Sequence, residues 1–199
     1  MSENKALLLN EVPQLTLEQL FQIQTQTPPT PIRNFPNGNK TYNVDLNTRQ
    51  IEVPKTLSLS RDHKSTVIYF KMDRWYDYMD LTNTVCLIQY YPANKKELDL
   101  KAPYFYVVPF FDILSCEDEG KMIFPWVIGD AATQAGGKVE FAIRFYKVEM
   151  NEAGDISLVY NLNTIPASTT IVNSFEADNE AMQVEYDAPI ASAYENLIS

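Results

Sequence analysis

The stretch that decides the fold runs from Met122 to Thr170: MIFPWVIGDAATQAGGKVEFAIRFYKVEMNEAGDISLVYNLNTIPASTT. Short runs of apolar, aromatic and β-branched residues alternate in it with small clusters of Gly, Asn, Asp, Ala and Pro. The runs are typical of β-strands, and the clusters are typical of the turns between strands. The stretch therefore predicts a strand, a polar turn, a strand, a tight turn, a strand, and a last strand after residues 163–166.

The clearest strand covers residues 138–148. Its alternation places apolar side chains on one face and mostly polar side chains on the other: Val139, Phe141, Ile143 and Phe145 against Lys138, Glu140, Arg144 and Tyr146. A period of two residues indicates a strand with one buried face. We expect Phe141, Ile143 and Phe145 to lie in the core together with Trp126, which falls in the preceding strand.

Residues 41–174 as a whole predict an all-β domain. Residues 42–46 and 49–53 indicate a hairpin, and further strands are expected at 65–72, 84–91, 104–108 and 112–116, with a polar loop at 73–83. Short strands with frequent turn signals are typical of an antiparallel sandwich. We therefore predict an immunoglobulin-like antiparallel β-sandwich.

An N-terminal arm, residues 1–40, precedes this domain and holds five of the twelve prolines. Residues 16–23 predict one short helix, with Thr16 as the N-cap and Gln19 completing a capping box. A helix of this length is not stable alone. Its apolar face, formed by Leu17, Leu20 and Phe21, is therefore expected to contact a partner.

A C-terminal tail, residues 175–199, follows the domain. From Glu176 onward it holds six acidic residues and no Lys or Arg, within a chain of net charge −10. Two interpretations stand: a solvated tail, or a peptide that docks on a basic neighbouring subunit. The overall acidity argues against a nucleic-acid partner, because phosphate binding needs clustered Lys and Arg.

The sequence also indicates where the protein is made. No apolar stretch approaches the roughly 18–20 residues that span a bilayer, and the N-terminal Leu7–Leu9 run is too short for a signal peptide. We expect synthesis in a cytoplasm and no membrane partner. Cys86 and Cys116 are then expected to be buried reduced thiols, with a disulfide as the alternative.

Catalytic and metal-binding residues are scarce. His63 is the only histidine and lies in a polar loop without a nucleophile motif nearby, so a solvated loop residue is expected. One His and two separated Cys do not supply a zinc site. The acidic run 117–120 lacks the ligand spacing of an EF-hand and indicates a hairpin turn. We expect no cofactor, no metal and no enzymatic activity.

The aromatic cluster Trp75, Tyr76 and Tyr78 falls in the predicted loop 73–83. Tyr and Trp are enriched at protein interfaces, and their rings also stack on sugars. The alternative is that these rings pack over the end of the sandwich. We name the three residues as candidate partner contacts.

Several pieces of this chain resemble the N-terminal β-sandwich domain of bacteriophage upper baseplate proteins, a family of minor structural proteins in phages of Gram-positive hosts. The similar pieces are the Trp-containing strand 124–128, the small-residue turn 131–136, the alternating strand 139–145 and the segment 163–167. The resemblance covers roughly residues 55–175. It implies a domain that attaches a peripheral organelle to the particle, with the receptor-binding part carried on a C-terminal extension.

This chain shows no heptads and no second domain after the sandwich. We therefore expect a non-enzymatic virion protein of the baseplate, collar, fibre anchor or capsid surface. Its expected partners are other virion proteins and further copies of itself, and its expected location is the virion. The alternative is a carbohydrate-binding module that recognises host-surface glycans through exposed aromatic residues.

Overall fold

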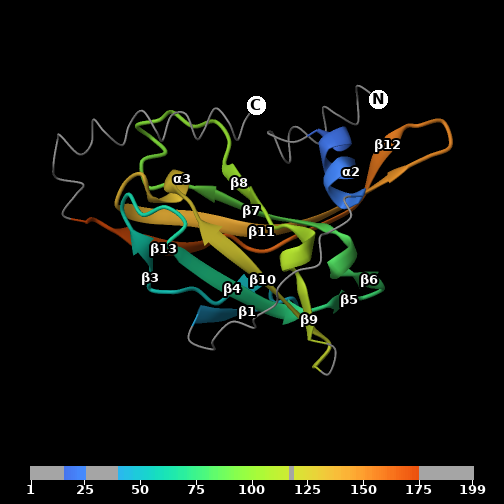
Figure 1. Ribbon diagram of the computed structural model, residues 1–199, viewed down its shortest axis with the longest axis horizontal. Helices are drawn as coiled ribbons and strands as arrows, with labels where there is room; N and C mark the ends of the chain where they lie inside the picture. Colours follow the sequence, from blue (N-terminus) through green and yellow to red (C-terminus); the bar gives the residue numbers. More distant parts are fainter. Residues whose placement is uncertain (1–15, 26–39, 117–118, 175–199) are drawn as a thin grey trace.

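The computed structural model describes residues 16–25, 40–116 and 119–174. In these ranges the chain forms two curled β-sheets that face each other, and a helix covers the outer side of one of them (Figure 1). The prediction of an all-β fold is confirmed. The expected arm and tail at 1–15, 26–39 and 175–199, and the acidic pair at 117–118, lie outside the described residues.

The first sheet has five strands. Their spatial order is β2 (Gln50–Ile51), β1 (Thr41–Asp45), β4 (Thr66–Asp73), β10 (Lys121–Ile128) and β9 (Leu114–Cys116). The hairpin predicted near residue 47 is present, because β1 and β2 pair antiparallel with Val44 opposite Ile51.

The second sheet is built around the long strand β11. Its order is β3 (Thr56–Leu59), β13 (Ala167–Val172), β11 (Gly137–Met150), β7 (Val85–Tyr91) and β8 (Tyr104–Val107), with β12 (Ile156–Asn163) also paired to β11. One edge of β11 is shared along its length: β13 pairs with residues 137–141 and β12 with residues 144–150. The predicted strand 138–148 therefore organises the whole sheet.

The prediction of purely antiparallel sheets is wrong at two pairs. β1 runs parallel to β4, and β13 runs parallel to β3. Neither pair is joined by a turn: β2 and β3 intervene between β1 and β4, and more than half of the chain lies between β3 and β13. Only a tight turn forces antiparallel pairing, and a long connection permits either direction.

Aromatic rings from both sheets interlock in the core. The residues expected there from the alternation are all buried: Trp126, Phe141, Ile143 and Phe145. The ring centroid of Phe141 lies 5.1 Å from that of Trp126 and 6.0 Å from that of Phe70, across the gap between the sheets. Each such ring pair stabilises the fold by about 0.5–1.5 kcal/mol beyond the contribution of its buried apolar area. These contacts hold the two sheets together.

The helix α2 (Leu17–Thr25) begins as the sequence predicts. The Thr16 N–H donates to Gln19 Oε1 at 2.9 Å, and the Gln19 N–H donates to Thr16 Oγ1 at 3.1 Å. This reciprocal pair is the expected capping box, which satisfies two N–H groups that the first turn leaves free.

The apolar face of α2 is used within the chain itself, which corrects two expectations. Leu17 and Leu20, expected to contact a partner, are buried in a second cluster with Tyr146 and Val148, and Phe21 is half-buried against it. Tyr146 was expected on the polar face of its strand but is fully buried under the helix. A helix this short needs an apolar surface to persist, and the outer face of β11 supplies one.

A side-chain amide fixes α2 to the strand. Gln24 Nε2 donates to the Val148 carbonyl at 2.9 Å, and the Val148 N–H donates to Gln24 Oε1 at 3.1 Å. β7 pairs with β11 only as far as Tyr146, which stands opposite Val85, so Val148 lies beyond the end of that pairing. The Gln24 amide supplies the missing backbone partner there, so the helix is docked in one register.

Candidate binding surface

The predicted loop 73–83 contains a small structured unit. β5 (Trp75–Tyr76) and β6 (Met79–Asp80) form a two-stranded hairpin, followed by a 3-10 helix at Leu81–Asn83. We call residues 75–80 the aromatic hairpin. Trp75 stands opposite Asp80 and Tyr76 opposite Met79. The turn needs a positive φ of 51° at Asp77, a conformation that Asp adopts more readily than most residues.

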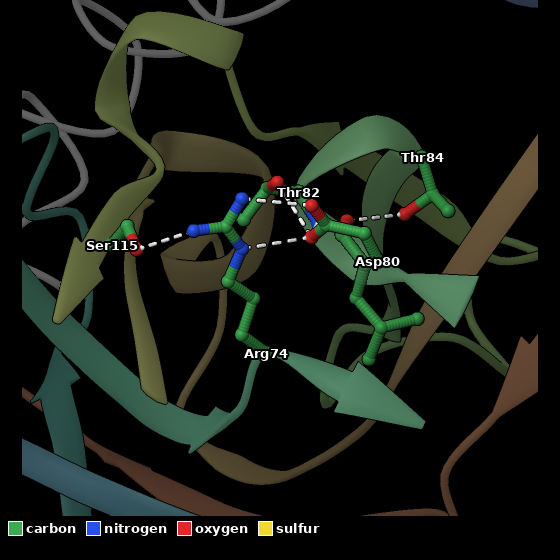
Figure 2. A network of polar contacts seen from close by, with 6 residues as sticks. Arg74, Asp80, Thr82, Thr84 and Ser115 are labelled. Carbon is green, nitrogen blue, oxygen red and sulfur yellow. Dashed lines mark hydrogen bonds and ion pairs between the residues drawn. The ribbon is translucent and has the colours of Figure 1, made fainter. Parts of the chain in front are cut away.

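A bidentate ion pair braces one side of the aromatic hairpin. Arg74 donates from Nε to Asp80 Oδ1 at 3.0 Å and from Nη2 to Asp80 Oδ2 at 2.8 Å. Its Nη1 donates to Ser115 Oγ at 2.9 Å, which ties the unit to β9 (Figure 2). All three nitrogens of the guanidinium are therefore used, and planar fork geometry of this kind allows little freedom.

The Asp80 carboxylate also organises the chain that follows. Oδ1 accepts the Thr82 N–H at 3.1 Å and the Thr82 hydroxyl at 2.7 Å, which caps the 3-10 helix. Burial alone would raise the pKa of Asp80, but the hydrogen bonds from Arg74 and Thr82 outweigh it and lower the pKa below its usual value. Asp80 therefore stays charged at neutral pH and keeps the bracing network intact.

A second arginine holds the opposite side. Arg49 Nη2 donates to the Tyr76 hydroxyl at 3.1 Å, and its guanidinium carbon lies 4.9 Å from the centre of the Tyr76 ring. Arg49 Nη1 donates to the Asn163 carbonyl at 2.8 Å, so the contact reaches β12. Together with Arg74, this contact clamps the aromatic hairpin from two sides.

The clamps leave two large aromatic side chains in solvent. Trp75 is 53% exposed and Tyr78 is 79% exposed. Tyr76 is half-buried and packs against the main core. Of the six residues named as candidate partner contacts, the structure brings Trp75, Tyr76 and Tyr78 together. Leu17, Leu20 and Phe21 belong to α2 and pack against the second sheet of the same chain.

His63 has a local structural contact. Its Nδ1 accepts the Asp130 N–H at 3.0 Å, at the start of the short helix α3 (Asp130–Thr133), and lies 3.5 Å from Asp130 Oδ1. The side chain is 45% exposed. The small-residue turn expected at 131–136 thus includes a helical turn, and His63 satisfies the first N–H of that turn.

The Cys86 thiol and groups of possible metal ligands are the other candidates for chemistry. Cys86 is a buried free thiol, and burial raises its pKa well above the ordinary value. No group of three or more His, Cys, Asp or Glu side chains in the described ranges is placed to hold a metal ion. Neither helix in those ranges is long and apolar enough to cross a membrane.

Comparisons with known proteins do not assign a family: no family model matches this chain, and no curated protein is significantly similar to it. The functional argument therefore depends on the residues themselves. The aromatic residues of the surface could be named from the sequence, but the bracing residues Arg49, Arg74 and Asp80 could not. Arg74 directly precedes the aromatic hairpin and Asp80 is its last residue, so their contact follows from the pairing of Trp75 with Asp80 and not from a local sequence pattern.

Proposed function

We propose that this protein is a non-enzymatic structural component of a phage virion, which attaches to neighbouring subunits through the aromatic hairpin and its terminal segments. We propose further that residues 41–174 form an immunoglobulin-like sandwich. Several copies of the chain assemble with one another in the particle. The proposed function requires no cofactor.

The observation that carries the proposal is the rigid presentation of Trp75. Its ring lies beside the Arg74 guanidinium, 6.0 Å from centroid to carbon, and that guanidinium is itself fixed by Asp80 and Ser115. Binding usually costs about 0.5–1.5 kcal/mol for each flexible side chain that becomes ordered. A preorganised Trp avoids part of that cost, and Trp is among the residues most enriched at interface hot spots.

The charge distribution supports a role for the C-terminal tail in attachment. The described residues hold 14 Lys and Arg and 16 Asp and Glu, so most of the net charge of −10 lies outside them. The six acids between residues 176 and 195 form its largest share. A nearly neutral domain with an acidic tail suits docking onto a basic neighbour.

The virion assignment depends on the resemblance of residues 55–175 to the sandwich domain of upper baseplate proteins. The most specific pieces of the resemblance are the strand around Trp126 and the strand 139–145. These two strands contact each other in the core through the rings of Trp126 and Phe141. Within that assignment, the position in the particle is the baseplate, the collar, a fibre anchor or the capsid surface.

Glycan recognition by the exposed aromatic residues is the second candidate, because Trp75 and Tyr78 are open to solvent. A sugar-stacking platform needs two or three rings open on one face. Neighbouring residues of a strand point to opposite faces, and Tyr76 packs on the core. Tyr76 is therefore not part of such a platform, and the contact of Trp75 with the fixed Arg74 guanidinium favours insertion of Trp75 into a protein partner.

The test is incorporation of variants into particles. Trp75→Ala should reduce incorporation strongly, whereas Leu98→Ala, a matched change at another exposed apolar residue, should leave it unchanged. Both variants should unfold like the wild type, because neither side chain lies in the core. Normal assembly of Trp75→Ala would contradict the proposal, and pull-down with the other particle proteins identifies the partner.

A further inference from the structure

An open hollow of about 560 Å³ lies against the β1–β2 hairpin and the ends of β4 and β10. None of the aromatic side chains of the aromatic hairpin lines it. Its volume falls within the range of small-molecule sites, but its walls are mainly polar, unlike those of most such sites. The hollow therefore suits a ligand that makes many hydrogen bonds.

Strand register puts the polar side chains of the hollow on one face of the first sheet. Asn43 stands opposite Lys71, and Asp73 stands opposite Lys121. Side chains at directly opposed positions share a face, and so do residues two apart along a strand. These four side chains form a grid of alternating donors and acceptors on the face that looks away from the core.

The grid is held in place by two ion pairs. Lys121 Nζ donates to Asp73 Oδ1 at 2.6 Å, and Lys71 is paired with Glu119. A Lys ammonium has three donors and a carboxylate accepts about four hydrogen bonds, so the Lys121–Asp73 pair retains groups for a ligand. The side chains are ordered before any ligand arrives, which reduces the entropic cost of binding.

The hairpin wall of the hollow is ordered in the same way. The Glu52 N–H donates to the Asn43 carbonyl at 2.9 Å, and the Asn43 N–H donates to Glu52 Oε2 at 3.0 Å. Asp45 Oδ1 accepts the Asn47 N–H at 2.9 Å and so fixes the turn. The Asn43 carboxamide itself is exposed and available to a ligand.

Charge selects among polar ligands. The hollow is lined by two cations, Lys71 and Lys121, and by three anions, Asp45, Glu52 and Asp73. Both lysines are already paired with carboxylates. A phosphate or another anionic group would meet net negative charge there. A neutral ligand with several hydroxyl groups meets no such repulsion, and each hydroxyl both donates and accepts.

From this geometry we propose that the hollow is a binding site for a neutral saccharide, separate from the aromatic hairpin and additional to the attachment function. Sugar hydroxyls bridge the Asn43 carboxamide, the Lys121 ammonium group and the Asp73 carboxylate. An open polar site of this kind binds with an affinity on the order of millimolar.

The test is a titration of the isotope-labelled full-length protein, followed by NMR through its backbone amides. The probes are glucose, galactose, N-acetylglucosamine and rhamnose, each taken to millimolar concentrations, with inorganic phosphate as the anionic comparison. At least one sugar should shift the amides of residues 43–52, 71–73 and 121 in a saturable way, and phosphate should not shift them.

Three variants locate the site. Asp73→Asn should weaken sugar binding about tenfold, as expected for loss of a charged hydrogen-bond partner. Glu140→Gln is the matched control, because Glu140 is paired with Lys95 at 3.0 Å and is 40% exposed, against 49% for Asp73. Trp75→Ala should also bind normally.

Each remaining outcome overturns the proposal. These outcomes are the absence of any shift with all four sugars, unchanged binding by Asp73→Asn, saturable phosphate binding in the hollow, or loss of sugar binding in Trp75→Ala. The last result would move sugar recognition to the aromatic hairpin. None of them bears on particle incorporation, which depends on different residues.

Discussion

Truncation of Leu20 tests whether the N-terminal helix belongs to the domain or serves a partner. The Leu20 side chain is fully buried in the cluster that also contains Tyr146 and Val148. Leu20→Ala removes three buried carbons above the outer face of β11, and changes of this kind cost about 2–5 kcal/mol. Helix propensity does not add to the loss, because Ala is at least as good a helix former as Leu.

The assay is equilibrium unfolding in urea, with Gln22→Ala as the matched control. Gln22 lies on the exposed side of the same helix, so its truncation should change the free energy of unfolding by less than about 0.5 kcal/mol. Gln24→Ala gives an intermediate test. It leaves the N–H and carbonyl of Val148 without their partner, which costs about 1–3 kcal/mol.

A loss below about 1 kcal/mol for Leu20→Ala would refute this reasoning, because surface sites lose that little. It would mean that the helix is undocked in the free protein and available to a partner. The expected result instead implies that removing residues 1–40 damages the domain. Failed particle incorporation of such a deletion is then no evidence that the arm contacts other subunits.

Two further predictions concern the core and the bracing network. Phe141→Ala should cost about 3–5 kcal/mol in urea unfolding, because it opens a cavity between the sheets; a loss below about 1 kcal/mol would mean that the strand face is inverted. Asp80→Asn should cost about 1.5–3 kcal/mol near pH 7, because Arg74 loses its charged partner. Because the folded-state pKa of Asp80 lies below the ordinary value of 3.8, its stabilisation is complete above that pH and is lost as the pH falls through the lowered pKa. The difference between wild type and Asp80→Asn, measured by urea unfolding from neutral to strongly acidic pH, should therefore shrink at low pH, and a constant difference would rule out the charged pair as its cause.

The sequence by itself determined the features that depend on neighbouring residues. The alternation of residues 138–148 placed Phe141, Ile143 and Phe145 on the buried face, and Thr16 with Gln19 marked the start of α2. Turn residues located the β1–β2 hairpin. Each of these signals works because side-chain direction and backbone capping are set within a few residues along the chain.

Tertiary structure decided what depends on contacts between distant segments. Tyr146 has the spacing of an exposed residue, yet it is buried because a helix more than a hundred positions earlier covers it. The clamp of Arg49 on Tyr76 and Asn163, and the tie from Arg74 to Ser115, likewise join segments remote in sequence. Local periodicity carries no information on which distant segment will cover a face or supply a partner. The direction of β1 beside β4, the rigid aromatic hairpin and the polar hollow all arise from that long-range choice.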